Sequence, residues 1–336
     1  MPDYDVGYTS GCPGSRRHFG RTAHADENGT MASTLVFVSR PLLPRNVFDR
    51  LLDGARAAGL VPAGAEVSIR TSSERLVAKV ALDESRSAGA RQAAAEYLAA
   101  QVAAGTVAES DVCLAVVDAA LTGATQLLLV MDVDSTLIKQ EVIELLAAHA
   151  GREKEVAAVT EAAMRGELDF AQSLIQRVAT LKDLPATVLG EVGERIIFSD
   201  GARELVKRFH AAGHKVGVVS GGFQQILDPL AEELQLDHAL ANTLGIEGAV
   251  LDGTVHGKIV DRATKEEMLR SWAAGHGIDM AATIAAGDGA NDLDMVTAAG
   301  LGVAFNAKPA LKEKAGAQIN FSRLDVIADL VLDDLN

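Results

Sequence analysis

Short apolar runs alternate with longer segments of helical periodicity in the last two thirds of the chain. We predict strands at residues 127–131, 215–219 and 282–286, and helices at residues 202–212, 223–234, 265–274 and 293–299. This alternation is typical of a parallel sheet whose connections are right-handed and carry helices on both faces. The predicted fold class is therefore α/β, with a Rossmann-like parallel sheet.

A helical segment interrupts this alternation after the first of these strands. Residues 137–149 show the spacing of an amphipathic helix, and residues 153–196 continue in helix-forming sequence before the next strand. Because this stretch lies between two strands of one sheet, we predict an inserted helical cap at about residues 152–198. Farther along, Leu251-Asp252-Gly253-Thr254-Val255 predicts a hairpin turn.

The first third of the chain has a different order of elements. We place strands at residues 34–38, 66–70, 75–80 and 112–117, and helices at residues 48–59 and 90–104. This βαββαβ order is that of a ferredoxin-like unit, which we assign to residues 32–121. The unit resembles the ACT domains that bind amino acids as regulators, and oligomerisation is an equally good interpretation. The polar residues 1–31 predict a disordered extension, with Met31 as an alternative start.

Composition and charge narrow the class of protein. The 336 residues are 48% hydrophobic and 23% charged, which is typical of a soluble, core-forming chain. A net charge of -15 argues against a nucleic acid bound through a basic face. No apolar run approaches the roughly 20 residues that span a bilayer, and no secretory signal precedes residue 30. Cys12 and Cys113 are too few for a disulfide framework. We therefore expect a cytoplasmic protein without a membrane partner.

Polar residues interrupt three of the predicted strands at their carboxyl ends. Asp132 and Asp134 follow the first strand, Ser220-Gly221-Gly222 ends the second, and Gly287-Asp288-Gly289-Ala290-Asn291-Asp292 follows the third. The carboxyl ends of parallel strands share one edge, where ligands bind in such sheets, so we expect these breaks to meet. A buried carboxylate is costly unless it is paired or binds a metal. The acidic pair therefore requires a cation, a proton or a reaction.

These motifs resemble those of the haloacid dehalogenase superfamily of phosphatases. The resemblance rests on Asp132-Val133-Asp134-Ser135-Thr136, on Ser220, on Lys265 and on the motif at residues 287–292. Four motifs in order are far more specific than any one of them. Within the superfamily the chain is most similar to the phosphoserine phosphatase family, from about residue 127 to residue 320. Residues 122–336 are thus expected to form the phosphatase domain, and bacterial members often carry an ACT-like domain ahead of it.

The resemblance implies Mg²⁺-dependent hydrolysis of O-phospho-L-serine to L-serine and phosphate, the last step of serine biosynthesis. Asp132 would be the nucleophile, since a carboxylate can form an aspartyl-phosphate. Asp134 would give a proton to the leaving alkoxide and later take one from water. The implied Mg²⁺ ligands are Asp132, the backbone carbonyl of Asp134 and Asp288, with Asp292 as a further ligand or as a support behind the ligands.

The same resemblance implies the groups that would bind the phosphate. Ser220 and the amide of Gly221 would donate to phosphoryl oxygens, with a helix N-terminus behind them. Lys265 would neutralise phosphate charge and hold Asp132 in line. Asn291 would bind the substrate through its amide, although a helix N-cap is a competing interpretation.

A serine moiety offers one ammonium and one carboxylate, so its pocket should present one acid and one base. Glu141, which we place on the helix after the nucleophile, would bind the ammonium, and Arg177 would bind the carboxylate through its planar fork. Met164 and Phe170 would cover the site and exclude water. A competing interpretation makes Glu141 and Arg177 exposed charges on helices. Likewise, Met164 and Phe170 could simply belong to the hydrophobic core of the cap.

Two alternative functions stay open. The chain could act on another small phosphomonoester or pass the phosphoryl group to an alcohol such as homoserine. It could also be a non-catalytic amino-acid sensor or scaffold, although no catalytic motif residue is missing. None of the eight histidines falls in a motif or pairs at metal-ligand spacing on one helix. We further expect a homodimer, since ACT-like units commonly pair, and serine as an effector of residues 32–121.

Overall fold

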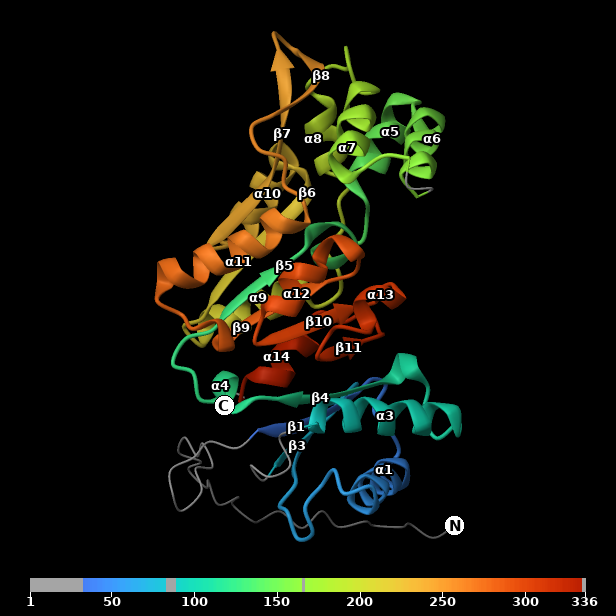
Figure 1. Ribbon diagram of the computed structural model, residues 1–336, viewed down its shortest axis with the longest axis vertical. Coiled ribbons are helices and arrows are strands. Elements are labelled where there is room, and N and C mark those ends of the chain that lie inside the picture. The colour runs from blue at the N-terminus through green and yellow to red at the C-terminus, as the bar shows by residue number, and fades with distance from the viewer. Residues whose placement is uncertain (1–32, 83–88, 165–166, 334–336) are drawn as a thin grey trace, which may run out of the picture.

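The computed structural model describes residues 33–82, 89–164 and 167–333, except for the side chains of residues 163 and 164. The predicted disordered extension at residues 1–31 lies outside the described residues. Figure 1 shows an N-terminal unit at one end of the molecule and a group of helices at the other, with a large sheet between them. Within the described ranges, no helix combines the length and the apolar character that crossing a membrane would need.

In the described residues, the N-terminal unit is a four-stranded antiparallel sheet with two α-helices. Its elements are β1 (Thr34–Ser39), α1 (Arg45–Ala57), β2 (Ser68–Thr71), β3 (Leu76–Ala81), α3 (Ala90–Ala103), the 3-10 turn η1 (Glu109–Asp111) and β4 (Val112–Val117). The sheet order β2-β3-β1-β4 confirms the predicted βαββαβ ferredoxin-like arrangement.

Both faces of this small sheet are covered, which explains why β1, β3 and β4 are largely apolar, whereas the edge strand β2 is mostly exposed. Leu35 of β1 packs with Ala55 of α1 and Ala94 of α3 on one face. Its neighbours Val36 and Val38 point to the other face and join the core of the large sheet.

The large sheet has seven strands in the order β11-β10-β9-β5-β6-β7-β8, and only β8 runs antiparallel to its neighbour. The strands are β5 (Leu128–Met131), β6 (Lys215–Phe223), β7 (His238–Glu247), β8 (Val250–His256), β9 (Thr283–Gly287), β10 (Leu301–Phe305) and β11 (Ala317–Ile319). The predicted parallel sheet is confirmed. The three strands with polar carboxyl ends, β9, β5 and β6, are direct neighbours.

Helices cover both faces of the large sheet. They are α4 (Ala119–Thr122), α9 (Ala202–Ala211), α10 (Gln224–Leu234), α11 (Arg262–His276), α12 (Leu293–Ala298), α13 (Pro309–Lys312) and α14 (Val326–Val331), with 3-10 turns η3 (Met280–Ala282) and η4 (Ala290–Asp292). The connections through α9 and α10 cross the sheet in one direction, and those through α11 and α12 return in the other. Because such connections are right-handed, the two pairs lie on opposite faces; Figure 1 shows α11 and α12 close together.

The inserted helical segment is present beyond the carboxyl end of the sheet. It contains α5 (Val142–Ala150), α6 (Glu153–Met164), α7 (Phe170–Ala179) and α8 (Val188–Gly193). Helix α5 packs on α6 and α8, so the helical layer begins before residue 152, and α7 packs on β8. Where the chain enters and leaves this layer, Ile138 forms an antiparallel bridge with Phe198.

Three local predictions are wrong. The helix expected from residue 137 begins at Val142, and the strand expected to end at Ser220 continues to Phe223. The hairpin exists, but its turn lies between β7 and β8 at Gly248, whereas residues 251–255 belong to β8. Gly253, with φ +81°, lies where the β7–β8 register shifts and therefore belongs to a β-bulge. The prediction failed because the residues of this bulge have the composition of a turn.

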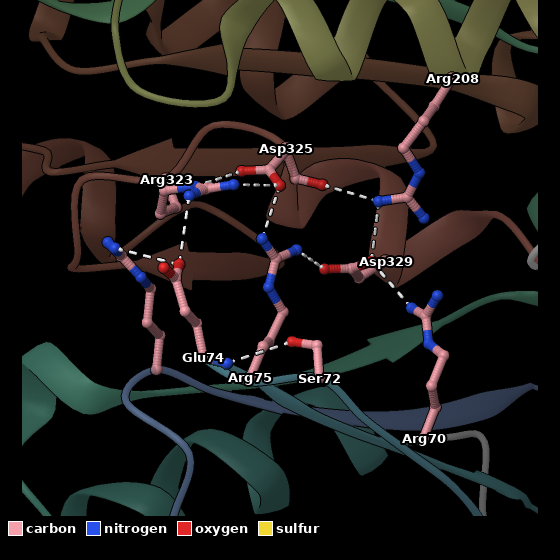
Figure 2. Close-up of polar contacts among 9 residues, drawn as sticks. Arg70, Ser72, Glu74, Arg75, Arg208, Arg323, Asp325 and Asp329 are labelled. Carbon is pink, nitrogen blue, oxygen red and sulfur yellow. Dashed lines mark hydrogen bonds and ion pairs between the residues drawn. The ribbon is translucent and has the colours of Figure 1, made fainter.

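Ion pairs join the N-terminal unit to the C-terminal helix of the large-sheet unit. Figure 2 shows Asp325 and Asp329 among arginines from distant parts of the chain. Arg75, directly before β3, contacts both carboxylates, at 2.5 Å from Asp325. Arg208 of α9 lies 2.8 Å from Asp329, and Arg323 lies 2.8 Å from Asp325. Both aspartates are buried.

Candidate active site

Asp132 directly follows β5 and begins a tight turn. Its N–H donates to the Ala286 carbonyl of β9 at 2.9 Å, and its Oδ1 accepts from the Val133 N–H at 2.7 Å. The turn η2 (Val133–Leu137) holds Ser135 at φ 56°, in the left-handed region that a non-glycine residue seldom adopts. The turn is too tight to continue into a helix, which explains the late start at Val142.

Three carboxylates meet beside this turn. One carboxylate oxygen from each of three residues lies within 4.8 Å of the other two; the residues are Asp132, Asp288 and Asp292. Oxygen ligands of this kind suit a hard divalent cation such as Mg²⁺, so the donor set fits a metal ion. The structure therefore brings together three of the four predicted metal-binding residues, while the predicted Asp134 carbonyl is not part of this side-chain cluster.

Lys265 is the cation that the protein itself supplies. It is 1% exposed, and its Nζ lies 2.7 Å from Asp132 Oδ1 and 2.7 Å from Asp292 Oδ1. The other oxygen of Asp292 accepts from the N–H groups of Asp288 (3.1 Å) and Gly289 (3.0 Å). Asp292 thus orients both the lysine and the loop after β9, and it also offers an oxygen to the carboxylate cluster.

The pKa values in this cluster reflect an excess of buried negative charge. Burial, followed by repulsion from Asp292, raises the pKa of Asp132 well above its usual range, although Lys265 opposes the shift. Burial and Asp292 also raise the pKa of Asp288 to about 6. Burial opposes the charge on Lys265, but Asp132 and Asp292 outweigh it and raise the pKa of the lysine. A further cation would relieve the repulsion among the carboxylates.

The loop at the end of β6 packs directly against Asp134. Ser220 is buried, and its Oγ donates to Asp134 Oδ2 at 3.2 Å and accepts from the Gly222 N–H at 2.8 Å. A Cβ on Gly222 would lie 2.8 Å from Asp134 Oδ2, so only glycine allows this approach. From the third loop, Asn291 Nδ2 donates to Asp132 Oδ2 at 3.3 Å. All three predicted motif loops meet at Asp132 and Asp134.

Asp134 occupies a different environment from Asp132. Its Oδ1 accepts from the Val142 N–H at 2.9 Å, at the start of α5. Burial, and next the charge of Glu141, raises its pKa to about 6, against the hydrogen bonds from Val142 and Ser220. A carboxyl group with this pKa can hold or release a proton near neutral pH.

Glu141 and Arg177 approach the site from two elements. Glu141 lies at the N-cap of α5 and not within the helix as predicted, and its Oε1 accepts from Ser135 Oγ at 2.7 Å. Arg177 extends from α7, where burial lowers its pKa while Glu141 and Asp134 raise it. The carboxylates of Glu141 and Asp134 are therefore within electrostatic reach of the guanidinium.

Phe170 lies over the β6 loop. A Cβ on Gly221 would lie 2.9 Å from Phe170 Cζ, so the ring packs against the loop that carries Ser220. Met164 ends α6, but its side chain lies outside the described part of the structure, so its predicted role is not addressed by these contacts.

Two residues of the site escaped the sequence analysis. Ser135 was part of a motif but had no role, and it positions Glu141. Asn242 of β7 is 1% exposed and contacts the β6 loop through its side chain. Its only sequence signal is a polar residue within the apolar stretch of a strand.

Comparison with known proteins agrees with this geometry. The haloacid dehalogenase-like hydrolase family matches residues 129–297. The phosphoserine phosphatase SerB2 of Mycobacterium tuberculosis is 53% identical over 224 residues, covering 67% of this chain and 55% of that protein. A phosphoserine phosphatase of Streptococcus thermophilus is 50% identical over 208 residues, covering 62% of this chain and 96% of that protein. The chain spans about half the length of the first relatives that it matches.

Solved structures extend the likeness to the whole fold. A haloacid dehalogenase family hydrolase of Salmonella enterica serovar Typhi has a TM-score of 0.77 at 28% identity, covering 90% of this chain and all of that one. A phospho-aspartyl intermediate analogue of phosphoserine phosphatase has a TM-score of 0.58 at 42% identity, covering 62% of this chain and 99% of that one. With its motifs assembled around Asp132 at the carboxyl edge of a parallel sheet, this chain belongs to the haloacid dehalogenase-like hydrolase family.

Proposed function

We propose that this protein hydrolyses O-phospho-L-serine to L-serine and phosphate. One observation carries the proposal: a buried carboxylate, Asp132, sits among Lys265, Asp288 and Asp292, with a second carboxylate, Asp134, directly beside it. These groups are a nucleophile, cation-binding groups and a proton donor, which phosphoryl transfer to a carboxylate requires. The phosphoserine phosphatases that the chain resembles, with 50% and 53% identity, support the choice of substrate.

In the proposed reaction Asp132 attacks phosphorus, and the bond between phosphorus and the serine oxygen breaks. Asp134 gives its proton to that oxygen as serine leaves. Water then attacks the phosphorus of the aspartyl-phosphate while Asp134 takes a proton from the water, and the bond to Asp132 breaks with release of phosphate. The shared loop geometry supports these roles, because Asp134 is fixed by Val142 and Ser220 beside the nucleophile.

Charge on the phosphate group must be neutralised for a carboxylate to approach it. We assign this to Lys265, with Ser220 Oγ and the Gly221 amide as donors to phosphoryl oxygens and Asn291 as a further contact. Asp132, Asp288 and the Asp134 carbonyl would hold Mg²⁺, with Asp292 behind them. When bound, Mg²⁺ would supply the positive charge that screens the nucleophile from the phosphate dianion.

We assign substrate choice to Glu141 for the ammonium and Arg177 for the carboxylate. Their opposite charges, at the N-cap of α5 and on α7, match the two charges of a serine moiety. Phe170, which packs against Gly221, would cover the reacting group together with Met164 and exclude water.

We also propose separate roles for the two domains of the chain. Residues 32–121 would be an ACT-like regulatory or oligomerisation domain that binds serine and pairs in a homodimer, after an extension at residues 1–31. Residues 122–336 would be the phosphatase domain, with a cap at about residues 152–198. We place the protein in the cytoplasm. Its acidic composition supports action on a small molecule and not on nucleic acid.

A phosphate-release screen over small phosphomonoesters, with Mg²⁺ and with a chelator, tests the proposal. We expect O-phospho-L-serine to give the highest kcat/KM, and turnover to require the metal. The variant Asp132→Asn, which keeps the shape of the side chain, should abolish turnover. Preference for another phosphomonoester would refute the substrate, and turnover by Asp132→Asn would refute the nucleophile.

A further inference from the structure

The β6 loop that carries Ser220 is an irregularity in a parallel ladder. Val219 pairs with Leu240 and Phe223 pairs with Asn242, so three residues of β6 stand opposite one residue of β7. The backbone ladder between the two strands is interrupted at this point. Side chains replace part of the missing backbone pairing. For example, Gln224 Oε1 accepts from the Ala241 N–H at 2.6 Å.

Asn242 connects the β6 loop to the segment of chain that precedes α11. Its Nδ2 donates to the Gly221 carbonyl at 2.9 Å, and its Oδ1 accepts from the Val260 N–H at 2.8 Å. The side chain is 1% exposed, so both bonds lie away from water. In such surroundings a lost partner leaves a buried polar group unpaired.

Val260 leads directly to the helix that carries Lys265. The next residue, Asp261, caps α11 by accepting from the Thr264 N–H at 2.8 Å, and its carbonyl accepts from the Lys265 N–H at 3.0 Å. The amide of Asn242 therefore connects the loop of Ser220 and Gly221 to the start of the Lys265 helix. These are the two donor groups assigned to the phosphate.

We propose that Asn242 is a positioning residue that sets the distance between these two phosphate-binding elements. The inference rests on the proposed function, since it concerns the groups assigned to bind the phosphate in that reaction. Asn242 acts through Gly221 and Val260 and does not touch the substrate. Asparagine is required because one side chain must both donate and accept; aspartate keeps only the acceptor, and leucine keeps neither.

The variants Asn242→Leu and Asn242→Asp test this role. We expect each to lower kcat for O-phospho-L-serine by about ten- to a hundred-fold and to raise KM, since misplaced groups weaken contacts to the phosphate in the bound substrate and more strongly in the transition state. Calorimetry with inorganic phosphate and Mg²⁺ should show binding at least about ten-fold weaker than in the wild-type protein.

Thr283→Val is the matched control. Thr283 is buried at the amino end of β9, far from the carboxyl edge, and its hydroxyl also makes two bonds, to the Met280 carbonyl (2.7 Å) and from the Gly300 N–H (3.3 Å). We expect this variant to lose stability but to keep kcat and phosphate affinity. If Asn242→Leu melts below the assay temperature, Asn242→Asp, which retains the side-chain shape, takes its place.

The outcomes separate this inference from the proposed function. Asn242 variants that keep kcat and phosphate affinity, like Thr283→Val, overturn the positioning role alone. A wild-type protein that binds phosphate but hydrolyses no phosphomonoester overturns the proposed function, and the phosphate affinities of the variants still decide the role of Asn242. A wild-type protein that neither binds phosphate nor hydrolyses a phosphomonoester overturns both.

Discussion

Arg177 and Glu141 bring opposite charges to one part of the site, and they differ in how firmly they are held. Glu141 is fixed by Ser135 Oγ at 2.7 Å. Arg177 donates from Nε to the Ser173 carbonyl at 3.3 Å and, among the described residues, forms no ion pair. Its two terminal nitrogens are thus available to a planar anion such as a carboxylate.

Replacing Arg177 with Ala should therefore discriminate between substrates. We expect kcat/KM for O-phospho-L-serine to fall by about ten- to a hundred-fold, the range for a lost charge-assisted contact. For p-nitrophenyl phosphate, which has no carboxylate, the loss should stay within about three-fold. Both values come from phosphate release under the same conditions.

Arg152→Ala is the control for this comparison, because Arg152 belongs to the same helical layer but is exposed and pairs with Glu155. It should leave both substrates unaffected. An equal loss on both substrates in Arg177→Ala would mean that the arginine supports the helical layer and does not bind the substrate carboxylate.

At the residue scale, the sequence could predict which motif residues meet, but not how they are oriented. Asp132, Ser220 and Asp288 follow strands that are neighbours in a parallel sheet, so topology alone brings them together. Asn242 and Gly221 are joined by a side chain to backbone contact across strands. Such a contact leaves no periodic trace in the sequence.

At the element scale, the regular parts of strands and helices were predictable and their ends were not. Periodicity located β5 and α11, whereas the true start of α5 depends on Ser135 adopting a left-handed conformation. A similar limit applies to β8, where Gly253 forms a bulge and not a turn. Single residues with unusual backbone conformations decide these boundaries, and apolar periodicity does not report them.

A pair of histidines joins the first residue of β7 to the last residue of α11. His238 Nε2 lies 2.7 Å from His276 Nε2, and the His238 ring stacks on Trp272 with centroids 4.7 Å apart. Burial, and next the neighbouring His276, lowers the pKa of His238, while Lys215 lowers it further and Asp237 raises it. The folded protein therefore favours the neutral ring.

This pair should make stability depend on pH in the weakly acidic range. Because the folded pKa of His238 is lowered, the unfolded chain binds the proton first as the pH falls. The contribution to stability is present above the unfolded pKa of about 6.5 and is lost as the pH falls from there through the folded pKa. Urea unfolding followed by Trp272 fluorescence at several pH values between these limits should show this loss.

Removing either ring should weaken this dependence. His238→Asn removes the titrating group, and His276→Asn removes the neighbour that lowers its pKa, so both variants should show a shallower slope than the wild-type protein. A slope that is unchanged in His238→Asn would assign the pH dependence to another group.

At the scale of the whole molecule, the N-terminal unit and the large sheet share a buried ionic contact at the end opposite the helical layer (Figures 1 and 2). Arg75 pairs with Asp325 and Asp329, which are about 250 positions away in the chain. No local pattern could predict this contact, although both units were recognisable separately. A second contact lies closer to the site, because Lys312 of α13 pairs with Glu109 of the N-terminal unit while Lys308, at the N-cap of α13, lies 3.8 Å from Asp288.

Arg75 is expected to be the most sensitive residue of this contact. Arg75→Met keeps much of the apolar stem but leaves Asp325 and Asp329 with fewer partners in a buried place. Loss of one partner from a buried ion pair costs about 3–5 kcal/mol, so the free energy of unfolding in urea should fall by that order. Arg45→Met, which breaks the exposed pair with Asp49, should change it by about 1 kcal/mol or less.

The pH dependence of the same measurement identifies the carboxylate involved. Burial alone would raise the pKa of Asp325, but hydrogen bonds from Arg323 and Arg75 lower it. A lowered folded pKa stabilises the protein above the unfolded pKa of about 3.9, and this contribution is lost as the pH falls through the folded pKa. Arg75→Met removes part of that shift, so its stability should fall less steeply on acidification than that of the wild-type protein. Parallel curves for the two proteins would show that Arg323 alone maintains the ionised state of Asp325.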